Sequence, residues 1–258
     1  MSGLNFDEFI IDHTITVSDV YDIKKDSVRK NNIGSYYFNF LLEDKDSHDK
    51  SYLLSRGFYP DMQQYLYEEG NNPLYWIQVR STRINIPLCS LERNNTYNRF
   101  YKGGFSIERV YFKDLKNHIP SMQTVFNQYK KLKEIDEDLN FKKLDLFSNI
   151  ILFVAYDKDK NPYAYNLGFL YDSSLVLSFN FQINNDKYYS VGSVLRSEVR
   201  KWCVDNGIEY YYIGDGYEDW GIYKSSESRG FEWWNGKDWI TDVDSYVSLC
   251  NKDLKMKD

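Results

Sequence analysis

The sequence contains few of the residues that build metal sites or disulfide frameworks. Only three cysteines and three histidines occur among its 258 residues. The cysteines are odd in number and show no CxxC spacing, and the histidines are equally scattered: Cys89, Cys203 and Cys250; His13, His48 and His118. We therefore expect neither a structural metal nor a disulfide framework.

Positive charge and long apolar runs are also scarce. The formal net charge is −6 and the sequence pI is about 5.2, so no global basic field draws the chain to nucleic-acid phosphates. Any contact with tRNA or DNA must rest on a local patch. No run approaches the roughly 18 apolar residues of a membrane helix, and the first residues lack a basic segment followed by an apolar one. We expect a cytoplasmic protein without a membrane partner, and the oligomeric state stays open.

Aromatic side chains, in contrast, are abundant. Aromatic residues make up 18% of the sequence and hydrophobic residues 42%, which excludes a disordered chain. A chain of this length can bury one large core or two smaller ones. We expect two lobes, a smaller N-terminal α/β lobe over residues 1–118 and a C-terminal domain over residues 119–258.

Helical periodicity first appears after Pro120. Ser121 is suited to cap a helix there, and Met122, Val125 and Phe126 recur at the spacing of one helical face. The charged stretch KKLKEIDED that follows is typical of a solvated helix face. The pattern therefore predicts a helix that begins at Ser121.

From residue 150 the pattern changes to strands. Three runs, IILFVAY (150–156), AYNLGFLY (164–171) and LVLSFNF (175–181), are rich in β-formers and joined by short turns. They predict an antiparallel meander with short connections.

A helix and a fourth strand follow the meander. The segment 190–207 has apolar residues at helical spacing, Ser190 or Ser193 as a cap, and Asn206-Gly207 as a stop. The strand IEYYYIG (208–214) comes at once afterwards. This order predicts a strand–helix–strand unit whose two strands run parallel.

An antiparallel meander that leads into such a unit resembles the layout of the GNAT acyltransferase fold, an α+β fold. The resemblance implies that the strands LVLSFNF and IEYYYI splay apart and that the acyl donor enters the gap. It also implies that the helix start, around residues 191–194, points its unpaired N–H groups at the donor.

Two glycine-containing segments lie next to that predicted gap. The helix start, DKYYSVGSV, has the single glycine Gly192 and no basic residue three positions before it, so a simple capped start is favoured over a pyrophosphate site. The strand IEYYYIG runs into Gly214-Asp215-Gly216, which is either a turn or a place where Asp215 acts as a general base on an amine.

The C-terminal third resembles the aminoacyl-tRNA–protein transferases, the arginyl and bacterial leucyl enzymes of the N-degron pathway. Their pattern is roughly YYxGYxIxxxxxMxYK, a short polar segment and a final Trp. The matching residues are Tyr211, Tyr212, Gly214, Tyr223, Lys224 and Trp239. Upstream, Ser190, Gly192 and Gly207 fall in register with the same family.

The N-terminal half resembles the same family. The stretch SYLLSRGFYPDMQQYLYEEGNNPLYWIQVRSTRINI is similar to an LLxRGWRRxGxxxY segment followed by xYxxIRVPV. The matching residues are Leu53, Leu54, Arg56, Gly57, Phe58, Arg80 and Ile84. The resemblance thus runs from about residue 35 to about residue 240.

The chain departs from the family at three places. The region GSYYFNFLLEDKD has no cysteine where family members often carry a cluster, so no iron–sulfur cluster or other metal is expected. Asp215 replaces the tyrosine after the strand glycine, and Ile222 replaces the methionine before the Tyr-Lys pair. These two changes lie where the donor should bind.

The resemblance implies transfer of an amino acid from charged tRNA to an amine, such as the N-terminus of an acceptor protein or peptide. The ester is already activated, so proximity and backbone donors to the oxyanion are sufficient, and no catalytic triad is needed. The co-substrate is then an aminoacyl-tRNA.

Binding roles follow for several side chains. Arg80 is the first choice and Arg56 the second for binding an acidic acceptor, with a surface salt bridge as the alternative. Lys224 is suited to a donor phosphate or an acceptor carboxylate. Tyr223 and Trp239 either stack on the terminal adenine or belong to the core.

Two other functions fit the same pattern. One is a GNAT-like acyltransferase with a different donor or acceptor, namely acyl-CoA or a modified DNA base. The other is a non-catalytic interaction protein that keeps the fold, since fold does not imply function.

Overall fold

The computed structural model describes residues 28–30, 36–38, 41–43, 49–67, 73–91, 95–183, 191–226 and 229–253. Two compact units are present, each assembled from separate stretches of chain. Unit 1 comprises Met1–Met62, Pro73–Asn85 and Tyr212–Asp258, and unit 2 comprises Gln63–Asn72 and Ile86–Tyr211. The predicted division between residues 118 and 119 stays a prediction, because compactness does not show which stretches fold on their own.

Unit 2 is built on an antiparallel meander. Its strands β7 (Ser106–Val110), β8 (Ile150–Tyr156), β9 (Pro162–Tyr171) and β10 (Ser174–Gln182) neighbour one another in chain order, and each pair is antiparallel. The meander predicted for residues 150–181 is confirmed. The register shifts once in β10, where Leu177 pairs with Gly168 but Phe179 pairs with Leu167. Ser178 is therefore an extra residue that bulges out of the ladder.

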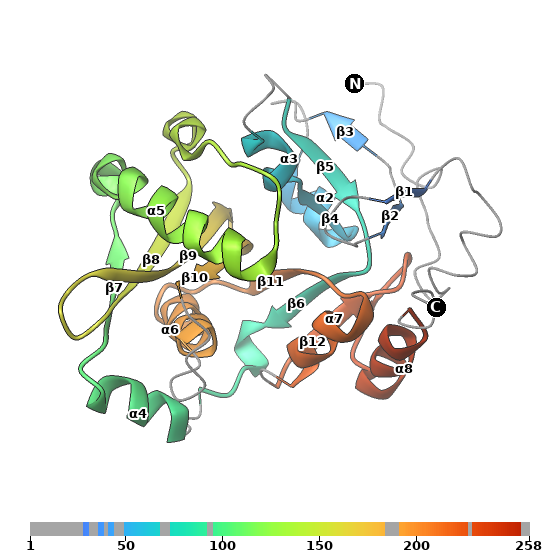
Figure 1. Ribbon diagram of the computed structural model, residues 1–258. Coiled ribbons are helices and arrows are strands. Elements are labelled where there is room, and N and C mark those ends of the chain that lie inside the picture. Colours follow the sequence, from blue (N-terminus) through green and yellow to red (C-terminus); the bar gives the residue numbers. More distant parts are fainter. Residues whose placement is uncertain are drawn as a thin grey trace. The chain divides into compact units, whose positions relative to one another are not determined.

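Two helices cover opposite faces of these strands (Figure 1). Helix α5 (Leu115–Lys133) packs on the face that carries Tyr165, whose hydroxyl lies 2.6 Å from the Ser121 Oγ. Helix α6 (Val191–Asp205) packs on the other face, where Trp202 meets Phe153 edge to face. Side chains alternate between the two faces along a strand, so Phe153 and the next residue of β8 point to opposite faces. This alternation gives each helix an apolar face to pack on.

Helix α5 begins earlier than the sequence predicts. It starts at Leu115, directly after the 3₁₀ turn η3 (Phe112–Asp114), and Pro120 lies within it. The buried Leu115 secures the first turn, and the chain stays helical through the exposed Pro120 although proline has no N–H donor and crowds the preceding turn. Ser121 is not a cap; its Oγ donates to the carbonyl of His118.

Helix α6 and strand β11 (Tyr210–Asp215) form as predicted. The helix stops at Asn206-Gly207, where Gly207 has a φ of 67°. The N–H groups of Glu209 and Tyr210 then donate to the carbonyl of Ser173, at 2.8 and 3.4 Å. This places the beginning of β11 beside the beginning of β10, as a parallel pair requires. The splay of the two strands farther along stays a prediction.

Unit 1 contains the remaining strands. Strand β6 (Ser81–Asn85) pairs with β12 (Phe231–Trp234), which also pairs with β13 (Trp239–Ile240). A separate sheet has the order β3 (Leu41–Glu43), β5 (Tyr75–Gln78), β4 (Phe58–Pro60). The helices are α2 (Lys50–Ser55), α7 (Glu218–Ser225) and α8 (Val243–Asp253), and α3 (Met62–Leu66) begins at the end of the first stretch.

The remaining elements are divided between the two units. They are β1 (Val28–Lys30), β2 (Tyr36–Phe38), η2 (Ile86–Leu88), α4 (Asn95–Lys102) and η4 (Phe141–Leu146). The fold class is thus α+β, with the GNAT-like order of meander, helix and strand and with a small α/β region before it. Within the described ranges, no helix is long and apolar enough to cross a membrane.

Candidate functional site

All predicted site residues except Gly192 fall in unit 1. They come from the end of α2, the segment before β6, the end of β11, helix α7 and strand β13. Several of them meet around the turn Gly214-Asp215-Gly216, which we call the GDG turn. Gly192 lies in unit 2, at the start of α6.

Arg80 is wholly buried and binds the GDG turn. Its Nη1 lies 2.6 Å from the Asp253 Oδ2 in an ion pair, and it donates to the carbonyl of Gly216 at 3.2 Å. The guanidinium also lies 4.7 Å from the ring centre of Tyr217. Burial by itself lowers the pKa of Arg80, but the charge of Asp253 raises it above the ordinary value. Arg80 therefore stays charged, and its role toward an acceptor stays a prediction.

The GDG turn has a fixed backbone. Gly214 has a φ of 87°, a conformation that favours glycine, and its carbonyl accepts from the Thr82 Oγ1 at 2.7 Å. A Cβ on Gly216 would lie 2.6 Å from the ring of Tyr246, so no larger residue fits. Asp215 is 9% exposed, and its backbone carbonyl accepts a hydrogen bond from Lys224. The two glycines are thus needed for the turn itself.

Lys224 and Tyr223 lie side by side in α7 but differ in exposure. Lys224 is 5% exposed, whereas Tyr223 is 45% exposed. The Lys224 ammonium holds the GDG turn through the Asp215 carbonyl. Of the two, Tyr223 is the one whose side chain reaches the surface.

Trp239 lies in a group of cations and rings. The Arg83 guanidinium lies 3.9 Å from its ring centre and forms an ion pair with Glu232 at 2.7 Å. The indole N–H of Trp239 donates to the carbonyl of Ser55 at 2.9 Å. One face of Trp239 is therefore covered by Arg83, which sequence reasoning did not choose. The signal that could have pointed to Arg83 is its position in the sequence, three residues after the chosen Arg80.

Arg56 also lies over a tryptophan ring. Its guanidinium lies 5.6 Å from the ring centre of Trp234, which is buried. Gly57 follows with a φ of 76°, and a Cβ there would lie 2.2 Å from the Trp234 Cδ1. Packing against Trp234 therefore explains why an Arg-Gly pair, the one that matches the family segment, stands at this point of the chain.

Polar groups of unit 2 converge at the start of α6. The N–H of Gly192 donates to the Gln182 Oε1 at 3.0 Å. A Cβ on Gly192 would lie 3.4 Å from the Asn180 Nδ2 and 3.5 Å from the Arg196 Nη1. Of the two predicted caps, Ser190 lies outside the described residues, and Ser193 is not a cap because it lies within the helix. The side chain that accepts from the first turn is that of Gln182. An arginine at the positive end of a helix favours an anion there.

The bulge of β10 is the second polar feature of unit 2. The Ser178 hydroxyl is buried and has no hydrogen-bond partner among the described residues. Its backbone is displaced from the ladder with β9. The strand therefore carries polar groups at Ser178, Asn180 and Gln182, which lead along β10 toward the start of α6.

A metal site is not seen in the part of the chain that the structure describes. Among the described residues, no group of three or more His, Cys, Asp or Glu side chains lies close enough together to hold an ion. Burial also raises the pKa of Cys250 to about 11, so its thiol stays protonated beside the GDG turn.

No protein-family model matches the sequence, and no curated protein matches it. Among solved structures, the chain is similar to L-PGS from Bacillus licheniformis at 12% identity and a TM-score of 0.44, covering 53% of this chain and 44% of that chain. It is also similar to the C-terminal domain (DUF2156) of an Agrobacterium fabrum protein assigned as a lysylphosphatidylglycerol synthetase, at 11% identity and a TM-score of 0.47, covering 79% and 68%. A third likeness is to the PaiA N-acetyltransferase of Thermoplasma acidophilum in complex with coenzyme A, at 14% identity and a TM-score of 0.30, covering 40% and 74%. The chain thus spans less than half of the L-PGS structure, and at these values the likenesses carry no inference about activity.

Proposed function

We propose that this chain is a GNAT-like acyltransferase that moves an amino acid from charged tRNA to an amine, such as the N-terminus of a protein or peptide. The polar start of α6 next to the bulged strand β10 is the observation that carries the proposal. The sequence resemblance at both ends of the chain supports the choice of donor.

Strand β10 and helix α6 offer the groups that acyl transfer requires. A bulge turns backbone groups out of the ladder, and such groups stabilise the oxyanion of a tetrahedral intermediate. The start of α6 adds the positive end of a helix and the guanidinium of Arg196. Together they suit a substrate that carries an ester carbonyl and a neighbouring phosphate.

The proposed reaction is an aminolysis. The neutral amine attacks the ester carbonyl, a C–N bond forms, and the ester C–O bond breaks. The ribose hydroxyl of the tRNA leaves with a proton, and the amine loses one. Asp215 is the proposed acceptor of the amine proton, held in place by Lys224 and by the GDG turn.

Unit 1 contains the other side chains for which binding roles are predicted. The exposed Tyr223 is the proposed stacking partner of the terminal adenine, whereas Trp239 already contacts Arg83, Tyr212 and Trp234. Lys224 and Arg80 act through the GDG turn, and Arg56 remains the second choice for an acidic acceptor. Neither a metal nor an iron–sulfur cluster is part of the proposal.

A transfer assay tests the function. The purified protein is mixed with tRNA charged with each of the twenty amino acids and with peptides of varied N-terminal residue, and products are identified by mass spectrometry. One or more amino acids should be added to an α-amine. If none is added, the proposal is wrong. Acetyl transfer from acetyl-CoA to the same peptides would instead favour an acyl-CoA donor on the same fold.

A substitution at the start of α6 tests the site. Arg196→Met keeps the length of the side chain and removes its charge, so we expect transfer to fall about tenfold or more, as for the loss of one strong charged contact. Lys131→Met, an exposed change in α5, is the control and should leave the rate unaltered. Equal rates for the two variants would contradict the assignment of Arg196.

A further inference from the structure

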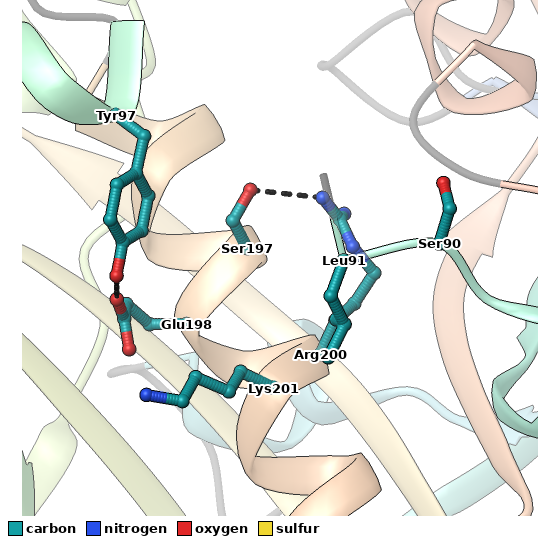
Figure 2. Close-up of a pocket in the computed structure, with 7 residues that line it drawn as sticks. All are labelled: Ser90, Leu91, Tyr97, Ser197, Glu198, Arg200 and Lys201. Carbon is teal, nitrogen blue, oxygen red and sulfur yellow. Dashed lines mark hydrogen bonds between the residues drawn. The ribbon is translucent and has the colours of Figure 1, made fainter. Parts of the chain in front are cut away.

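A small cavity lies between α4 and the outer face of α6, away from the polar start of α6. Its volume is about 40 Å³, more than one water molecule needs. The side chains that line it include Tyr97, Ser197, Glu198, Arg200 and Lys201 (Figure 2). All of them belong to unit 2. The proposed transfer reaction assigns no role to this cavity.

The acidic residue of the cavity is already bound by α4. The hydroxyls of Tyr97 and Tyr101 both donate to the Glu198 Oε1, the second at 2.9 Å. Figure 2 shows the carboxylate turned toward Tyr97. Burial and the neighbouring Glu198 raise the pKa of Tyr101, which keeps its phenol protonated as a donor. Hydrogen bonds from neutral hydroxyls do not cancel the formal charge of Glu198, but the two cations of the lining, Arg200 and Lys201, exceed it by one.

Arg200 is the buried cation of the cavity. It is 7% exposed, and its Nη2 donates to the Ser197 Oγ at 2.9 Å. Figure 2 shows the two groups facing each other, away from Glu198. A guanidinium presents several N–H donors in a planar fork that matches phosphate geometry. The next residue, Lys201, is exposed and adds a second positive charge at the rim.

The surface around the cavity is basic and aromatic. Arg99 and Lys102 are exposed in the last turn of α4, on either side of the half-exposed Tyr101. On β7, Arg109 lies 4.4 Å from the ring centre of Tyr111. In a chain of net charge −6, this is the kind of local patch that RNA binding requires. Exposed acids among the described residues include Asp205, at the end of α6, and Glu108 on β7.

We propose that the α4–α6 surface, formed by Arg99, Tyr101, Lys102, Arg200 and Lys201, binds the phosphate backbone of RNA, with one phosphate seated in the cavity. The proposal rests on the proposed function, because charged tRNA is the donor there. Cations interleaved with exposed tyrosines neutralise phosphates and stack bases. An acidic peptide offers no base to stack, so RNA uses more of this surface.

Binding is measured with the full chain and a fluorescein-labelled RNA stem-loop, by anisotropy over a range of salt concentrations. The triple variant Arg99→Ala, Lys102→Ala, Lys201→Ala should bind about tenfold more weakly or worse. The slope of log K against log salt should become shallower by about 2 to 3, since about 0.7–0.9 is lost for each phosphate contact. The control, Lys131→Ala, Lys133→Ala, Lys142→Ala, removes the same charge from exposed positions on α5 and η4 and should bind as the wild type does.

Three kinds of outcome overturn the assignment. The first is equal weakening in the two triple variants, or no salt-dependent binding by the wild type. The second is full displacement of the RNA by inorganic phosphate at constant ionic strength, which indicates a small-anion site. The third is displacement by a poly-glutamate peptide that itself depends on the same three cations, which indicates an acidic protein partner.

A short donor separates this proposal from the proposed function. An aminoacyl-adenosine ester carries the reactive end of charged tRNA without its body. The α4–α6 triple variant should keep transfer from the short donor and lose transfer from tRNA. A wild type that binds RNA through this surface but transfers from neither donor refutes the function and supports the surface. A triple variant that uses tRNA as well as the wild type does refutes the surface and leaves the function standing.

Discussion

Arg80 keeps its charge inside unit 1 because its partners come from distant parts of the chain. Asp253 at the end of α8 supplies the counter-charge, and Gly216 supplies a carbonyl. Both side chains are buried, so water cannot replace either partner as the neighbour of the other charge. Such a pair stabilises a fold weakly as a whole, but the loss of one partner strands the other.

This arrangement predicts an asymmetry between single and double substitutions. Asp253→Asn should lower the free energy of unfolding by about 3–5 kcal/mol, because Arg80 is left buried without a counter-charge. The double variant Arg80→Met, Asp253→Leu should recover a large part of that loss. Urea unfolding followed by tryptophan fluorescence measures the three proteins. A double variant no more stable than Asp253→Asn would contradict the account.

Two helices end on glycines of like conformation but different surroundings. Gly57 follows α2 with a φ of 76°, and Gly207 follows α6 with a φ of 67°. A Cβ on Gly57 would lie 2.2 Å from the Trp234 Cδ1, whereas one on Gly207 would meet nothing within 4 Å. The first glycine is needed for space and for backbone conformation, and the second for conformation alone.

The two glycines provide a matched pair of substitutions. Gly207→Ala should cost about 1–2 kcal/mol, the strain of a left-handed residue with a side chain. Gly57→Ala carries the same strain plus overpacking against a buried indole, about 1–3 kcal/mol more. Thermal unfolding of the two variants gives the difference. Equal losses would show that Trp234 moves aside at no cost.

At the scale of the whole molecule, the core of unit 2 depends on a buried phenol. Tyr165 lies between the meander and α5, with its hydroxyl 2.6 Å from the Ser121 Oγ. Burial raises its pKa from 10 to about 12, and the hydrogen bond with Ser121 only partly offsets this. The folded state therefore holds this proton more tightly than the unfolded chain does.

The sign of the pH dependence follows. Below pH 10 both states are protonated and the stabilisation is complete. As the pH rises from 10 to about 12, the unfolded chain loses the proton first, so stability declines. In Tyr165→Phe, the free energy of unfolding should fall by about 1 kcal/mol less over this pH range, once solvent screening is taken into account. Urea unfolding at pH 8 to 11.5 measures it, with the exposed Tyr111→Phe as control; an unchanged slope in Tyr165→Phe would contradict the assignment.

Local patterns predicted much of the fold, and distant partners accounted for the differences. The strands of the meander, helix α6, its stop at Gly207 and strand β11 all have periodicities or turn signals within a few residues. The start of α5 was missed because the packing of Leu115 outweighed the proline. In the candidate site, the glycines of the GDG turn were found from sequence. The ion pair of Arg80 with Asp253 joins residues 173 positions apart, which no local signal encodes.

Strand β11 passes from unit 2 into unit 1 at Tyr211–Tyr212, and this bears on the order in which the two units are completed on the ribosome. Unit 2 has all its segments once residue 211 has emerged. The early segments of unit 1, up to Asn85, must wait for the residues from Tyr212 onward before they gain their partners in β12 and α8. Domains usually fold in the order in which they are synthesised. Here the earliest segments belong to the unit that is completed last. Until Asp253 has been synthesised, Arg80 has no carboxylate to neutralise its charge.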